Sequence, residues 1–176
     1  MNIASLQKKD LIEKNTILMV VYGIAATLGG LAQFFLDRPL GLALSLLIPA
    51  CVTFAFYIIQ RKVEKLQVAF PYFVIVSGVI TVYGCIVSFH VTLATIVLSF
   101  FILVLASVHN KVSIILTGFV GSMIGLAFNF LLDTTGIAVD PANVIVTGTL
   151  MALAIFLQVR QNKRMLGNLE NLMIES

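Results

Sequence analysis

Three polar side chains stand at or near the ends of long apolar stretches of this sequence: Gln33, His90 and Asn129. Amides and imidazole rings both donate and accept hydrogen bonds, so they are suited to hold a small ligand in an apolar setting. Three carboxylates lie close to the same boundaries: Asp37, Asp133 and Asp140. We therefore predict a small ligand pocket bordered by Gln33, His90 and Asn129. The alternatives are that Gln33 and Asn129 only join neighbouring helices, and that His90 simply faces water.

The chain shows no pattern of catalytic residues. His90 and His109 fall on opposite sides of the arrangement predicted below, and neither a phosphate-binding loop nor a nucleophile paired with a base is present. The two cysteines, Cys51 and Cys85, lie within apolar stretches and lack metal-ligand spacing, so space-filling is their expected role. We expect no enzyme activity, no metal site and no bound cofactor.

The composition predicts a membrane protein. Of its 176 residues, 60% are hydrophobic and 11% are charged, whereas soluble domains average about 45–50% and about 25%. A bilayer core requires about 20 apolar residues per helix. Six stretches without Asp, Glu, Lys or Arg come close to that length: about 16–36, 39–60, 67–89, 91–107, 112–132 and 141–159. We predict an all-α bundle of six transmembrane helices, arranged as three hairpins.

The basic residues predict the orientation. Under the six-span arrangement, Arg38 alone of 11 Lys and Arg residues lies on one side. The others share the opposite side: Lys8, Lys9, Lys14, Arg61, Lys62, Lys65, Lys111, Arg160, Lys163 and Arg164. Basic loops face the cytoplasm, so residues 1–15 and 160–176 are expected to be cytoplasmic segments of a multi-pass plasma membrane protein. The positive charge then faces membrane lipids, and no nucleic-acid partner is needed.

Small residues and prolines predict how the helices pack. Pro49 stands in the middle of the second span and is expected to kink it. The fifth span contains Gly118, Gly121, Ser122 and Gly125 at three- and four-residue spacing. Such small residues let another helix approach closely, either within this bundle or in a dimer. We favour packing within the bundle.

The last residues carry a heptad pattern. Its seam is formed by Val159, Asn162, Leu166, Leu169, Met173 and Ser176. Spacings of three and four residues are typical of a coiled coil, although a short amphipathic surface helix is the alternative. We expect Leu166, Leu169 and Met173 to form a signal-output helix in a homodimer, and the chain to be the membrane portion of a longer protein.

Two stretches, LQKKDLIEKNTILMVVYGIA at the start and QNKRMLGNLENLMIES at the end, resemble the membrane domain of Bacillus-type methyl-accepting chemotaxis proteins. A third, SVHNKVSIILTGFVGSMIGLAFNFLLD, is similar to their fourth-to-fifth span region. The resemblance implies a dimeric transducer whose cytoplasmic hairpin binds a coupling protein and a histidine kinase. The methylation helices and kinase-contacting tip of that family are absent from these residues, so no family site is transferred.

These observations lead to one functional hypothesis and two alternatives. We expect the membrane sensor of a chemoreceptor-like transducer, which passes a signal through the sixth helix to a cytoplasmic coiled coil. The membrane sensor of a histidine kinase would fit the same tail. A small six-span transporter or permease subunit would also explain the spans, but no ionisable residue of the kind that usually marks transport pathways lies within them.

Overall fold

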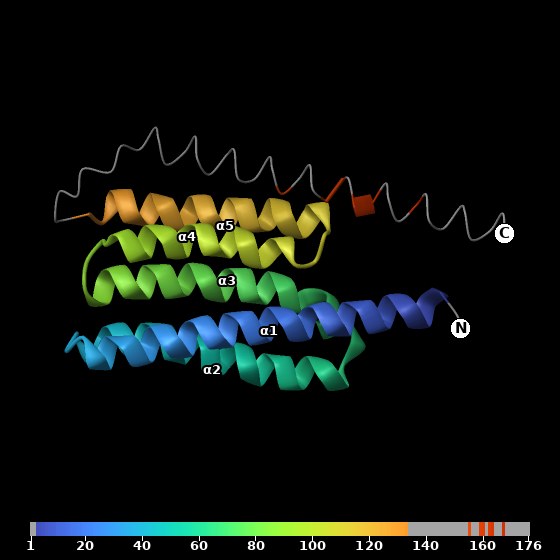
Figure 1. Cartoon of the computed structure of the whole chain (residues 1–176), viewed down its shortest axis with the longest axis horizontal. Helices are drawn as coiled ribbons and strands as arrows, with labels where there is room; N and C mark the ends of the chain where they lie inside the picture. Colours follow the sequence, from blue (N-terminus) through green and yellow to red (C-terminus); the bar gives the residue numbers. More distant parts are fainter. Residues whose placement is uncertain (1–2, 134–154, 156–158, 161, 164–166, 168–176) are drawn as a thin grey trace.

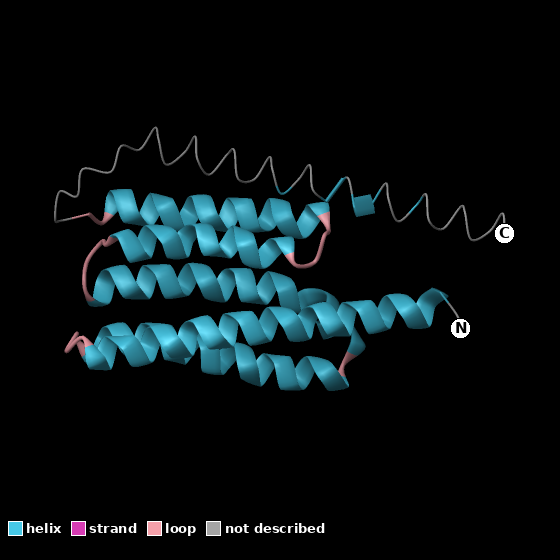
Figure 2. Ribbon diagram, viewed as in Figure 1, coloured by secondary structure: helices cyan, strands magenta, loops and turns pink. Residues whose placement is uncertain are grey.

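The computed structural model describes residues 3–133 and, further along, residues 155, 159, 160, 162, 163 and 167. Its elements are all helical, as predicted: α1 (Ile3–Phe35), α2 (Leu40–Lys62), α3 (Glu64–Ser88), α4 (Leu93–Ser107) and α5 (Val112–Leu131). Figure 2 shows that these helices are joined by short loops. The apolar stretches between charges therefore form helices, because a helix satisfies its own backbone groups where water is absent.

The helices run antiparallel to their neighbours in sequence, and α3 lies at the centre (Figure 1). Helix α3 contacts all four of the others, with α1 and α2 on one side and α4 and α5 on the other. The α1–α2 and α3–α4 turns share one end of the bundle, which we call the Arg38 end. The α2–α3 and α4–α5 turns share the opposite end, which we call the His109 end.

The distribution of side chains is that of a membrane protein. Large apolar residues such as Leu28, Ile80 and Leu116 face outward. Polar side chains are instead buried between helices, among them Asn15, Thr53, Gln60, Gln67, Ser77, Thr81, Thr95, Ser99, His109, Ser122 and Asn129. Lipid accepts an apolar surface and cannot satisfy polar groups, so this arrangement is favourable in a bilayer. Four of the five described helices, α1, α2, α3 and α5, are long and apolar enough to cross a membrane.

The helix bounds differ from the predicted spans at three places. Helix α1 already begins at Ile3, so most of segment 1–15 continues the first span as one helix. Helix α4 has only 15 residues, which rise about 22 Å against a hydrocarbon core of about 30 Å. The described residues hold five helices rather than six. The sixth predicted span, 141–159, lies outside them except for Ile155 and Val159, as do Leu166, Leu169 and Met173 of the predicted output helix.

The end of α1 is set by a left-handed residue. Asp37 has a φ of 52°, a conformation that Asp and Asn adopt more readily than other residues with a side chain. The Arg38 N–H donates to the Gln33 carbonyl at 3.0 Å, and the Asp37 N–H donates to the Phe34 carbonyl at 3.3 Å. This pair of bonds is the Schellman motif, which closes the last turn of a helix. It turns the chain toward Pro39 and α2.

The glycines of α5 pack within the bundle. A Cβ atom on Gly118 would lie 2.2 Å from the Ala106 Cβ of α4, and one on Gly121 would lie 2.9 Å from Ile75 of α3. One on Gly125 would lie 2.9 Å from the Ser99 hydroxyl. These positions confirm the predicted packing role, because only glycine permits so close an approach.

Candidate functional site

A cavity of about 370 Å³ opens at the Arg38 end, between α1, α2, α3 and α4. Its apolar walls are formed by Ala25, Gly29, Leu36, Leu42, Leu46, Cys85, Phe89, Ala94 and Leu98. Its polar lining is formed by Gln33, Arg38, His90, Thr92 and Thr95. We call this space the Arg38 cavity. A mostly apolar cleft of this size with a few polar groups has the usual character of a small-molecule site.

The structure brings two of the three predicted site residues together in this cavity. Gln33 on α1 and His90 in the α3–α4 turn both line it. The Gln33 amide donates to the Gly29 carbonyl of its own helix at 3.0 Å, and it joins no second helix among those that the structure describes. Its carbonyl oxygen is the acceptor that Gln33 can offer to a ligand.

Asn129 lies behind the cavity wall rather than in it. It is buried on α5, where its Oδ1 accepts a 2.6 Å hydrogen bond from the Thr95 hydroxyl. Its amide donates to the Ser99 hydroxyl at 3.1 Å. Asn129 is therefore a positioning residue, which fixes α4 against α5 and holds the Thr95 side of the cavity.

The start of α4 shapes the wall that carries His90. Thr92 and Thr95 form a capping box: the Thr92 N–H donates to the Thr95 hydroxyl at 3.0 Å, and the Thr95 N–H donates to the Thr92 hydroxyl at 3.3 Å. Such a box satisfies two backbone donors at the start of a helix. Because Thr95 also bonds Asn129, the turn that carries His90 is tied to α5 through one continuous set of hydrogen bonds.

Arg38 links the two turns at the mouth of the cavity. Its guanidinium carbon lies 4.8 Å from the centre of the Phe89 ring, and that ring lies 3.6 Å from the centre of the His90 ring. A guanidinium over an aromatic face is held by a cation–π interaction. The α1–α2 turn is thus joined to the α3–α4 turn by contacts that a ligand in the cavity would touch.

The lining predicts the chemistry of a ligand. Among the described residues, Arg38 is the one charged group in the lining, and no carboxylate is part of it. Arginine presents a planar fork of donors that matches a carboxylate. The remaining walls are apolar, so the cavity suits a small amphipathic molecule with an anionic head. No group of three potential metal-binding side chains occurs within the described part of the chain.

Below the cavity, polar side chains continue along the interface of α1, α2 and α3. The Tyr22 hydroxyl lies 2.9 Å from the Ser77 hydroxyl and 3.1 Å from that of Thr81. The Thr53 hydroxyl contacts the Ser77 hydroxyl at 2.8 Å. Thr53 and Ser77 also donate to the Pro49 carbonyl, at 2.7 Å and 3.2 Å. Helix α2 continues through Pro49, and these two hydroxyls tie the Pro49 carbonyl to the interface of α2 and α3.

A second polar layer lies nearer the His109 end. The Asn15 amide donates to the Gln60 side-chain oxygen at 3.2 Å and to the Gln67 carbonyl at 2.9 Å. Thr16 follows Asn15 on α1, and its hydroxyl lies 2.9 Å from that of Tyr57, which is one turn before Gln60 on α2. We call these two layers together the polar track. It joins α1, α2 and α3 along their shared interface.

Sequence reasoning missed Arg38 as a site residue and missed the polar track. Arg38 was counted only as the exception to the charge bias, although a lone cation beside Gln33 was itself a signal. The Thr92–Thr95 spacing was also a signal, because it is that of a capping box. The hydroxyls of the track gave no signal, since Ser and Thr are common in membrane helices and usually bond their own backbone.

No protein-family model, no curated protein and no solved structure matches this chain.

Proposed function

We propose that this protein is a membrane sensor, and that it binds a small amphipathic carboxylate in the Arg38 cavity. The observation that carries the proposal is the cavity itself, which is mostly apolar and has Arg38, Gln33 and His90 among its polar lining. A ligand there would touch α1, α2, α3, α4 and both turns at that end. Its binding would change how these helices pack against one another.

A path from the cavity to the tail supports this role. Thr95 and Leu98 on α4 line the cavity, and Leu103 lies further along the same helix. Leu103 packs with Ile115 of α5 and with Val159, which is 2% exposed. A shift of α4 would therefore be felt at Val159, at the start of the predicted output helix. Packed helices commonly transmit small shifts of this kind.

The proposal includes a topology and a partner. It has six spans with both termini in the cytoplasm, so that the Arg38 end faces outward from the plasma membrane. Ten basic residues against Arg38 alone support this orientation. The tail would pair in a homodimer through Leu166, Leu169 and Met173. The resemblance to chemotaxis transducers supports an output through a coupling protein and a histidine kinase, bound by a cytoplasmic region beyond these residues.

The binding step is tested with a panel of short-chain carboxylates. Each is added to the purified protein in detergent, and the unfolding temperature is measured. A ligand of the Arg38 cavity raises it in the natural protein and fails to do so in Arg38→Gln. The matched control is Arg61→Gln, because Arg61 also lies over an aromatic ring, 5.4 Å from the centre of Tyr57, but outside the cavity lining. If no carboxylate acts, or Arg38→Gln responds fully, the proposed ligand site is wrong.

The signalling step is tested by crosslinking in membranes. Single cysteines replace Leu166, Leu169 or Met173 in a chain whose Cys51 and Cys85 are changed to serine. A sensor gives dimers at these positions, and the identified carboxylate changes the crosslinking yield. Dimers whose crosslinking yield does not change with the ligand would show that ligand binding in the cavity does not affect the tail. Absence of any dimer would contradict the transducer.

A transporter is the second candidate, and the polar track favours it. The track runs along the α1–α2–α3 interface between cavities at the two ends of the bundle. A polar stripe of this kind is what a permeation path needs. The test is uptake of the identified carboxylate into proteoliposomes. Uptake that is lost in Tyr22→Phe would establish transport, whereas binding without uptake supports the sensor.

A further inference from the structure

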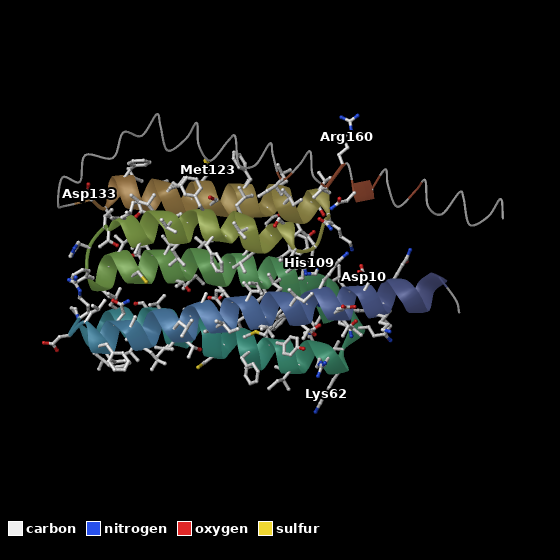
Figure 3. The ribbon with its side chains drawn as sticks, viewed as in Figure 1. Asp10, Lys62, His109, Met123, Asp133 and Arg160 are labelled. Atoms are coloured by element: carbon white, nitrogen blue, oxygen red, sulfur yellow. The ribbon has the colours of Figure 1, made fainter. Side chains whose placement is uncertain are left out.

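A second cavity, of about 690 Å³, lies at the His109 end of the bundle. It is lined by Gln7, Lys8, Asp10, Leu11, Lys14, Glu64, Gln67, His109 and Lys111. These residues come from the first turns of α1, the start of α3 and the α4–α5 turn. Figure 3 shows Asp10 and His109 at this end, on different elements. We call this space the His109 cavity.

The charges of the His109 cavity leave a positive excess. Its two carboxylates are already engaged, since Glu64 pairs with Lys8 and Asp10 pairs with Lys14 at 2.8 Å. Lys111 adds a third ammonium group to the lining. Three ammonium groups therefore face two carboxylates, which disfavours a cation and favours an anion.

His109 is the second observation that points to a ligand. Its side chain is 2% exposed and lines the cavity. Neither ring nitrogen has a hydrogen-bond partner among the residues that the structure describes. Buried polar groups are nearly always paired, so an imidazole in this state calls for a partner other than these residues, which a bound ligand would supply.

The electrostatics of His109 agree with an anion. Burial, followed by the positive charges of Lys14 and Lys111, lowers the pKa of the imidazole to about 4, and Asp10 opposes this shift. The free cavity thus keeps His109 neutral at ordinary pH. An anion bound beside it would offset the two lysines and allow the ring to gain a proton, which gives it two donors.

We propose that the His109 cavity binds a phosphate group, held by Lys14, Lys111 and the ring of His109. Phosphate offers several strong acceptor oxygens, so it can meet donors that converge from three directions. A carboxylate has two oxygens whose acceptor sites lie in one plane, so it is less suited to donors that converge from three directions. The phosphate can come from a free phosphate ion or from the headgroup of an anionic lipid, because the cavity lies where the helices emerge from the apolar stretches. The site is independent of the Arg38 cavity and of the function proposed for it.

The test observes His109 directly in the full chain. The sequence has 2 histidines, so ¹⁵N-labelled imidazole gives two sets of NMR signals, and His109→Gln assigns them. The protein is placed in phosphatidylcholine nanodiscs at pH 6.0. Inorganic phosphate is added at constant ionic strength, with chloride as the reference salt. Binding moves the His109 signals toward the imidazolium form in a saturable way and leaves those of His90 unchanged.

Two further measurements identify the source of the phosphate group and the side chains that bind it. If a lipid headgroup is the ligand, phosphatidylglycerol nanodiscs shift the His109 signals without added phosphate. Lys111→Gln weakens binding by about tenfold or more, as expected for one charge-assisted hydrogen bond. Lys62→Gln is the matched control, because Lys62 is exposed at the same end but is not part of the lining (Figure 3). His109 signals that respond to neither phosphate nor phosphatidylglycerol would overturn the proposal, as would equal effects of the two lysine variants.

Discussion

At the residue scale, the molecule uses each polar side chain in one of two ways. Some are fully engaged between helices, as Asn129 is with Thr95 and Ser99. Others, such as His109, are buried with atoms left unpaired within the described part of the chain. Asn129 holds the wall of the Arg38 cavity from behind, and His109 lines the His109 cavity. Whether a polar side chain is paired depends on which helices meet around it, so the residue type alone does not predict it.

Replacing Asn129 tests the first kind. Asn129→Ala removes the acceptor of the Thr95 hydroxyl and the donor to Ser99. Interhelical hydrogen bonds in membrane proteins average about 0.6 kcal/mol each, and the buried hydroxyls left behind add to the loss. We expect the free energy of unfolding to fall by about 1–2 kcal/mol. Thr117→Ala is the control, because among the described residues Thr117 bonds its own helix, at the Ser113 carbonyl. Equal effects of the two substitutions would contradict the positioning role of Asn129.

The pH dependence of stability tests the second kind. The pKa of His109 is about 4 in the folded protein, below about 6.5 for an unperturbed histidine. Between these values the unfolded chain binds more protons, so acidification favours unfolding. We expect the unfolding temperature in phosphate-free buffer to fall as the pH drops from about 6.5 to about 4. The unfolding temperature of His109→Gln should fall less over this pH range. Parallel pH curves for the two proteins would show that His109 titrates normally.

The sequence predicted part of the site at this scale, for a physical reason. Gln33 and His90 were found because an amide or imidazole at the end of an apolar run must face protein or water. Arg38 was passed over because its place above the Phe89 ring depends on the left-handed turn at Asp37. Asn129 was assigned to the pocket, and the structure places it one layer behind. The sequence pattern alone does not distinguish a residue that lines the cavity from one that holds the cavity wall from behind.

At the element scale, charge gaps predicted where the apolar helices lie, but not where helices begin. Helix α1 extends back to Ile3 because nothing in the charged segment breaks it. Its Asp10 and Lys14 form an ion pair one turn apart, which supports the helix outside the apolar region. Helix α4 begins later than predicted, at Leu93, because the capping box of Thr92 and Thr95 defines its first turn. Local hydrogen bonds of this kind set helix ends more closely than hydropathy does.

The contact between α4 and α5 gives a prediction in which a second substitution restores the stability that the first one removes. A Cβ atom on Gly118 would lie 2.2 Å from the Ala106 Cβ, while the next atoms are at 3.6 Å and 3.7 Å. Gly118→Ala therefore forces the helices apart, and overpacking of this kind costs about 1–3 kcal/mol. Ala106→Gly removes the one atom in the way, so the double variant should regain much of the loss. Thermal unfolding of the three variants measures this coupling.

The control for that contact is Gly23→Ala on α1. The nearest atom to a Cβ on Gly23 is the end of the Met19 side chain, at 3.4 Å, so this substitution should be tolerated. Purely additive effects of Gly118→Ala and Ala106→Gly would show that the two helices are not in the contact described here.

At the scale of the whole molecule, two cavities lie at opposite ends of one bundle, and α3 is the helix that both pairs of neighbours share. The Arg38 cavity is mostly apolar, whereas the His109 cavity is lined by charged groups. Helices α1, α2 and α3 are long and apolar enough to cross a membrane, and if they do so the two ends face different solutions. A ligand at either end would act on the same α1–α3 interface, where the polar track lies. The side of the membrane on which each end lies therefore determines which ligands can reach its cavity.

The topology can be tested because α4 is short. With 15 residues, it crosses the hydrocarbon core only if the bilayer thins locally, since a full crossing needs about 20 residues. We expect it to cross, because Lys111 would otherwise lie on the outer side with Arg38, against the charge bias. Single cysteines at Asp37, Lys62, Lys111 and Lys163, in a chain lacking Cys51 and Cys85, are exposed to a membrane-impermeant maleimide. Asp37→Cys should react in intact cells, and the other three only after permeabilisation. Reaction of Lys111→Cys in intact cells would show that α4 does not cross, and Lys111 could then not share a cavity with Lys14 and Glu64.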